Sequence, residues 1–125
     1  MNIHDAIKNI NNVRDDGMQG AVLELERRFG ILTDAITAII LMEPAHYETR
    51  KSDPLIKLSK TGVLNFNTNL DYDILEKGMI PLFDMFDANY IVYRVKEGDF
   101  CVFDITSGRS SWATKDFDVF INTYF

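Results

Sequence analysis

The stretch from Met79 to Phe125 constrains the fold of this chain more than any other. It contains three runs rich in β-forming residues, followed directly by an amphipathic pattern with helical period. Two turn signals, Glu97-Gly98 and Ser107-Gly108, separate the three runs. Tight turns join neighbouring antiparallel strands, so the stretch predicts an antiparallel meander that continues into a helix.

The two runs around the first turn, 90–95 and 100–105, predict central strands. Their side chains alternate between two largely apolar faces, so we expect helices over one face and partial cover over the other. One face carries Tyr90, Val92, Arg94, Cys101, Phe103 and Ile105. The other face carries Ile91, Tyr93, Val95, Phe100, Val102 and Asp104. The third run is expected to place Trp112 opposite Phe103.

Two residues mark the borders of this meander. Pro81 has no N–H to donate, which indicates that the run 80–83 is an edge strand or that Pro81 opens a strand. Thr114 is expected to cap the closing helix. The apolar stripe of that helix consists of Phe117, Phe120, Ile121 and Tyr124.

The N-terminal part of the chain predicts helices. Apolar residues recur at helical spacing over 3–13 and again over 18–29. Thr33 can cap a third helix over 34–42, although this run is rich enough in β-branched residues to form a buried strand. The cap, together with Pro44 just beyond the run, favours the helix.

Signals are weaker over 43–69, which we expect to be irregular, with one or two edge strands and a mobile loop. The extended candidates there are 55–58 and 63–66. Asp71 then can cap a short helix over 72–77. Together these patterns predict an α+β fold: a mostly antiparallel sheet of about four to six strands with helices packed on one face.

Length and composition agree with one globular domain over residues 1–125. Hydrophobic residues make up 46% of the 125 and charged residues 26%, which argues against disorder. Cys101 is the only cysteine, so no internal disulfide can form. There is no signal-peptide pattern and no apolar run long enough to cross a bilayer. We therefore expect a cytoplasmic protein that does not contact a membrane.

The net charge of the chain indicates which kinds of partner it would attract. Thirteen Lys and Arg against nineteen Asp and Glu give 13 − 19 = −6. Direct binding to nucleic acid needs concentrated positive charge, so we expect none. A negative balance suits a cationic partner, and it also serves solubility alone.

Catalytic, metal-binding and cofactor-binding patterns are not visible in the sequence. The histidines, His4 and His46, are far apart, and Cys101 falls in a predicted central strand where a thiol packs as a small hydrophobe. No zinc spacing, calcium loop or Gly-rich phosphate loop occurs. We expect no enzyme, no catalytic residue, no metal and no cofactor.

Several hydrophobic landmarks carry a family resemblance. The segment 25–32, LERRFGIL, resembles the E-x-x-x-G-I-x-LP segment of the SUKH superfamily, which comprises bacterial immunity proteins related to fungal cell-wall assembly regulators. Ile80-Pro81-Leu82-Phe83 is similar to that family's IPI strand. The hairpin over 90–105 resembles its central hairpin, and 112–120 resembles its closing helix.

The resemblance implies a SUKH-like α+β domain that binds and neutralises a cognate toxin, in many cases a nuclease with a basic surface. Acids near the sheet's loops are the candidate contact residues: Asp71, Asp73, Asp84, Asp87, Glu97 and Asp99. Two alternatives stay open. One is a regulatory or scaffold module of the same fold acting on cell-wall or signalling partners. The other is a small-molecule-binding or catalytic domain with a cavity under the sheet.

Overall fold

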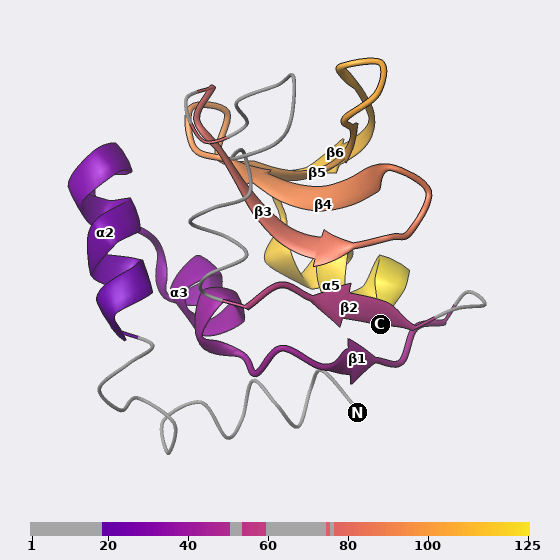
Figure 1. Ribbon diagram of the computed structural model, residues 1–125, viewed down its shortest axis with the longest axis horizontal. Coiled ribbons are helices and arrows are strands. Elements are labelled where there is room, and N and C mark those ends of the chain that lie inside the picture. The colour runs from indigo at the N-terminus through magenta and orange to yellow at the C-terminus, as the bar shows by residue number, and fades with distance from the viewer. Residues whose placement is uncertain (1–18, 51–53, 60–74, 76) are drawn as a thin grey trace.

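The computed structural model describes residues 19–50, 54–59, 75 and 77–125. These residues form one antiparallel sheet of six strands and three helices, so the expected α+β fold is confirmed (Figure 1). The predicted helix over 3–13 and the predicted strand over 63–66 lie outside the described residues, as does most of the short helix predicted over 72–77.

The strands lie in the sheet in the order in which they occur along the chain. The described helices are α2 (Gln19–Phe29), α3 (Asp34–Leu41) and α5 (Phe117–Tyr124). The strands are β1 (His46–Tyr47), β2 (Leu55–Lys57), β3 (Met79–Asp84), β4 (Asn89–Arg94), β5 (Asp99–Asp104) and β6 (Arg109–Thr114). Each strand pairs antiparallel with the next.

Local signals set the ends of α2 and α3 as the sequence predicts. Gly30 takes a positive φ of 90°, and its N–H donates to the carbonyl of Glu26 over 2.8 Å, which ends α2. Thr33 caps α3, since its Oγ1 accepts from the N–H of Ile36 at 3.4 Å. The run 36–41 is therefore helical rather than extended, as expected.

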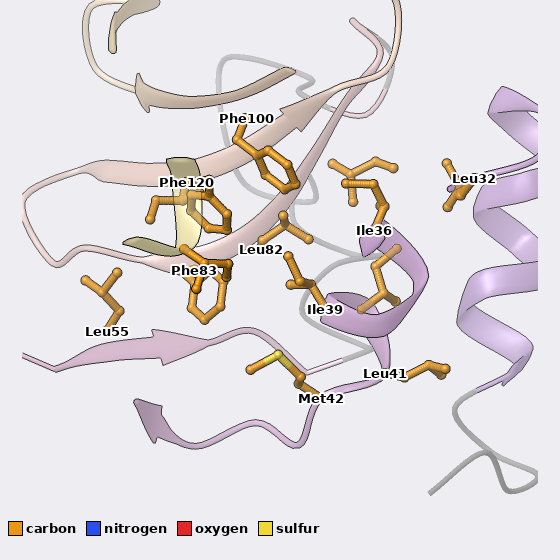
Figure 2. Packing of buried hydrophobic residues seen from close by; sticks show 14 of the residues in the cluster. Leu32, Ile36, Ile39, Leu41, Met42, Leu55, Leu82, Phe83, Phe100 and Phe120 are labelled. Atoms are coloured by element: carbon orange, nitrogen blue, oxygen red, sulfur yellow. The ribbon is translucent and has the colours of Figure 1, made fainter. Parts of the chain in front are cut away.

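The main core lies between the helices and one face of the sheet. Ile36 and Ile39 of α3 point toward Leu82 and Phe83 of β3, while Phe120 of α5 packs beside them (Figure 2). The rings of Phe100 and Phe120 stack with centroids 4.4 Å apart and planes 6° apart. Val22 and Leu25 of α2 are buried in the same cluster. All three helices thus contribute to one side of the sheet, as predicted.

The opposite face of the sheet carries a smaller apolar cluster. Its buried members are Met79, Val92, Cys101 and Phe103, with Tyr90 and Ile105 packed against them. No residue of α2, α3 or α5 belongs to this cluster. The alternation predicted for β4 and β5 is confirmed, because Ile91, Phe100 and Val102 belong to the main core instead.

Pro81 lies beside a bulge in β3 and not at the position in the sheet that its residue type predicts. β3 lies between β2 and β4 and begins at Met79, so the prediction of an edge strand or a first position is wrong. In β3, the residues that pair with β2 are Phe83 and Asp84, so the pairing with β2 does not reach Pro81. Among the described strands, only β4 pairs with Pro81. Because Pro81 has no N–H, it cannot donate a hydrogen bond, but this costs no hydrogen bond between β3 and β2. Leu82 is the extra residue of the bulge, and Phe83 joins the main core as a result.

The predicted partner of Trp112 is wrong, because the strands already pair in a different register where they leave the turn: Asp104 lies opposite Arg109 and Phe103 opposite Ser110. Continued without a bulge, this register would pair Trp112 with Cys101. A bulge with Ser111 as its extra residue shifts it by one, so Trp112 lies opposite Val102, not Phe103. Its ring packs edge-on against Tyr124 of α5, with centroids 5.2 Å apart.

The cap of α5 also differs from the prediction. Asp116 is the N-cap, because its Oδ1 accepts from the N–H groups of Asp118 at 2.8 Å and Val119 at 3.2 Å. Thr114 is the last residue of β6, and its Oγ1 accepts from the N–H of Asp116 at 3.2 Å. The predicted apolar stripe is confirmed, with Phe120, Ile121 and Tyr124 buried and Phe117 packed against the core.

The weakly patterned region contributes two short strands. β1 is an edge strand, whereas β2 lies between β1 and β3. The hydroxyl of Tyr47 in β1 donates to the carbonyl of Glu43 over 2.8 Å, which satisfies a fully buried phenol. None of the helices within the described ranges has the length and apolarity needed to span a bilayer.

Candidate partner-binding surface

The structure separates the predicted contact acids instead of gathering them. Two lie outside the described residues: Asp71 and Asp73. Asp84 and Asp87 belong to the β3–β4 connection, whereas Glu97 and Asp99 belong to the β4–β5 hairpin. Successive connections of an antiparallel meander lie at opposite ends of its strands. The two pairs of acids therefore lie at opposite ends of the sheet (Figure 1).

We define the acidic end as the end that carries the β3–β4 and β5–β6 connections, with Asp84, Asp87 and Asp104 as its acids. The two connections are joined directly, because the N–H of Ile105 donates to the carbonyl of Ala88 over 3.0 Å. They form one surface built from loops that are distant in sequence. Asp104, the last residue of β5, was not among the predicted contact acids.

Phe86 is the most distinctive residue of the acidic end. Its side chain is 53% exposed, and its backbone has a positive φ of 78°, which a bulky residue rarely adopts. Asp84 Oδ1 accepts from the N–H of Phe86 at 2.7 Å, which holds this conformation. Ala88 also has a positive φ, of 61°. The loop thus presents an aromatic ring to solvent between two acids, at a cost in backbone strain.

The sequence interpretation named Asp84 and Asp87 as contact acids but did not single out Phe86. The available signal was an aromatic residue between Asp84 and Asp87 in a segment of turn-forming residues. Such a residue has no strand or helix face to bury it. Its exposure could have been predicted from that position, but its strained φ could not.

Hydrogen bonds at the acidic end favour the charged form of the Asp104 carboxylate. The backbone N–H of Thr106, with that of Ser107, donates to Asp104 Oδ1 and holds the pKa of that carboxyl below its ordinary value. The pKa of the Tyr90 phenol is raised by burial and, to a lesser extent, by the charge of Asp84. Besides Asp84, Asp87 and Asp104, this end also carries one exposed cation of β6, Arg109, which lies opposite Asp104.

The opposite end of the sheet has a different character. Asp99 is only 6% exposed, so the prediction that it is a surface acid is wrong. Its carboxylate accepts two hydrogen bonds from Arg94, from Nε at 2.7 Å and from Nη2 at 2.5 Å. Glu97 is exposed in the turn beside Gly98, whose φ is 69°. Only Glu97 of this pair can meet a partner.

Cys101 and His46, the described cysteine and histidine, lie in different strands, β5 and β1. Cys101 is fully buried, and this burial raises the pKa of its thiol to about 11, although Arg94 opposes the shift. His46 is exposed on the edge strand β1. Within the described ranges, no three His, Cys, Asp or Glu side chains are grouped so that they could hold a metal ion.

Lys57 is a buried charge that the sequence interpretation did not single out. It lies in β2 on the core side and is 1% exposed. Its Nζ donates to the carbonyl of Leu58 at 2.6 Å and to that of Ile40 at 3.4 Å. Ile40 is in the last turn of α3, so Lys57 connects this helix to the sheet.

Comparison with known proteins gives no identification: no protein-family model, no curated protein and no solved structure matches this chain.

Proposed function

We propose that this domain binds another protein and acts in the cytoplasm as an immunity protein that neutralises a toxin with a basic surface. The observation that carries the proposal is the exposed ring of Phe86, held on a left-handed backbone between Asp84 and Asp87. The resemblance of the hydrophobic landmarks to the SUKH superfamily supplies the class of partner.

Phe86 keeps a strained backbone although its side chain is 53% exposed and belongs to neither apolar cluster of the described residues. Strain of this kind is found mainly at functional sites. Aromatic residues contribute strongly to binding energy when a partner's pocket covers them. Phe86 has the features of such an anchor.

Charge supports the same kind of partner. Asp84, Asp87 and Asp104 would form the polar rim around Phe86. The net charge of −6 would speed association with a basic protein at low salt, and charged rims fix the orientation of the complex. A toxin that binds nucleic acid has the required positive surface.

The experiment is co-expression with the toxin encoded by the neighbouring gene, followed by size-exclusion chromatography of the mixture. The wild-type domain should protect the cells and co-elute with the toxin. Phe86→Ala and the charge reversal Asp87→Lys should each weaken the complex at least tenfold. Glu97→Lys reverses an exposed acid at the opposite end of the sheet, so it should bind as the wild type does.

Each outcome has a definite meaning. Absence of both protection and complex would refute the immunity function. Protection that is equally sensitive to Glu97→Lys and Asp87→Lys would refute the acidic end as the contact surface. Capture of a housekeeping protein, with no toxin gene alongside, would favour the regulatory alternative.

A further inference from the structure

The environment of Lys57 matches a neutral amine better than an ammonium ion. Its Nζ has two acceptors among the described residues, the carbonyls of Leu58 and Ile40. A neutral amine has two N–H donors, whereas an ammonium has three. One N–H of the charged form therefore has no acceptor in a site that water does not reach, since the side chain is 1% exposed.

No carboxylate in the described part of the chain pairs with the Lys57 ammonium. Among the described residues, the ion pairs join Glu24 to Arg27 and Arg28, and Asp99 to Arg94, but none involves Lys57. The elements packed against Lys57 are α3, β1 with the segment before it, and β3. Their titratable groups are Asp34, Glu43, His46, Tyr47 and Asp84. Only Tyr47 is buried, and its hydroxyl donates to the carbonyl of Glu43.

We propose that the contact between α3 and β2 is a pH-responsive device, which accommodates Lys57 better as the neutral amine and tightens when Nζ loses its proton. Lys57 is the contact's central polar group: its backbone N–H donates to the carbonyl of Ala45 at 3.0 Å, while its side chain reaches the last turn of α3. A change in its protonation therefore acts on both elements at once.

Burial of Lys57 lowers the pKa of its ammonium from 10.5 to about 8. Because the folded state binds this proton less tightly than the unfolded state, deprotonation favours folding. The stabilisation sets in as pH rises through 8 and is complete above 10.5. At pH 7 the charged Lys57 weakens the contact.

The direct test is an NMR titration of the lysine ε-CH₂ groups in the wild-type protein. The Lys57 resonance should titrate with a midpoint near pH 8. It is assigned in the wild type through the backbone resonances, and its loss in Lys57→Met checks the assignment where that variant folds. Ordinary lysines titrate near pH 10.4. A Lys57 midpoint at that ordinary value would overturn the proposal.

The second test compares unfolding at pH 7 and pH 9. Relative to Lys57→Met, the unfolding equilibrium constant of the wild type should fall about tenfold between these two pH values. Lys96→Met removes an exposed lysine from the β4–β5 turn and is the matched control, which should follow the wild type. Parallel pH curves for the wild type and Lys57→Met would refute the device. The protection factors of the α3 amides against hydrogen exchange, which correct for the pH dependence of the intrinsic exchange rate, should rise over the same pH interval.

Discussion

Arg94 and Asp99 face each other across the β4–β5 hairpin and share two hydrogen bonds, of 2.7 and 2.5 Å. The pair lies where the two strands enter their turn, and the side chain of Arg94 is 25% exposed while that of Asp99 is 8% exposed. Hydrogen bonding to Asp99 raises the pKa of the Arg94 guanidinium above its ordinary value. The carboxylate therefore helps to hold the hairpin and is not free for a partner.

Asp99→Asn should destabilise the domain by about 2–3 kcal/mol, because Arg94 then keeps its charge in a mostly buried site without a counter-charge. Denaturant unfolding monitored by circular dichroism measures this loss. Glu97→Gln, which changes an exposed acid two residues away, should be nearly neutral. Equal stability of the two variants would mean that the Arg94–Asp99 pair does not hold the hairpin.

Phe120→Ala should cost about 3–5 kcal/mol, since it removes a fully buried ring that contacts five other rings and leaves a cavity. Val119→Ala alters the neighbouring residue, which is 46% exposed, and should change the free energy of unfolding little. Equilibrium unfolding of both variants is the measurement. A small effect of Phe120→Ala would contradict the packing of α5 on the sheet.

Asp116→Ala should lower the free energy of unfolding by about 1 kcal/mol, because two N–H groups at the start of α5 lose their acceptor. Thr114→Ala removes an acceptor of only one N–H outside the helix and should cost less. Thermal unfolding resolves this difference. The reverse ranking would restore Thr114 as the cap.

The raised pKa of the buried Cys101 thiol should lower the stability of the folded domain at high pH. Its thiol has a pKa of about 11 in the folded protein, against an ordinary value of 9. Below pH 9 the Cys101 thiol is protonated in both the folded and the unfolded protein. Between about pH 9 and 11 it loses its proton only in the unfolded chain, so ionisation of the thiol favours unfolding. The wild type should lose stability relative to Cys101→Ala between about pH 9 and 11. If the difference between the two proteins stays constant over that interval, the thiol is not protected by burial.

Phe86→Gly and Ala88→Gly separate strain from binding. Both residues have positive φ, so glycine at either position should stabilise the domain by about 0.5–1 kcal/mol. Under the proposed function, only Phe86→Gly should also weaken binding of the proposed toxin partner, because it alone removes the aromatic ring. Unfolding curves and binding isotherms of the two variants provide the comparison. Loss of stability in both would show that the loop is not strained.

Side-chain alternation was sufficient to predict the two faces of β4 and β5, because both strands are regular over their length. Alternation did not give the partner of Trp112, which depends on where the β5–β6 turn begins and ends as well as on the bulge at Ser111. A bulge adds one residue to one strand, so every position beyond it changes its partner. No residue type at Ser111 or Leu82 signals that insertion. The prediction for Pro81 rested on its missing N–H, and it failed because the short strand β2 pairs with β3 only beyond Pro81.

The candidate surface was predictable only in part. Counting connections along a meander would have placed Asp87 and Glu97 at opposite ends of the sheet. The burial of Asp99 follows from its register with Arg94, which becomes known only once the turn length is fixed. Lys57 could not be foreseen, because its burial depends on α3, a helix distant in sequence, covering the end of a short strand.

The order of the strands also bears on how the chain folds. Each strand pairs with its neighbour along the sequence. Turns of four residues join β4 to β5 and β5 to β6. Closing such short loops costs little chain entropy, so these strand pairings form at a small entropic cost. The C-terminal hairpins can therefore form early, whereas α3 must wait for a long-range encounter with the assembled β3. Until that encounter only the neighbouring α2 can cover apolar side chains of α3, so slow docking of these helices on the sheet prolongs the time during which a folding chain can aggregate.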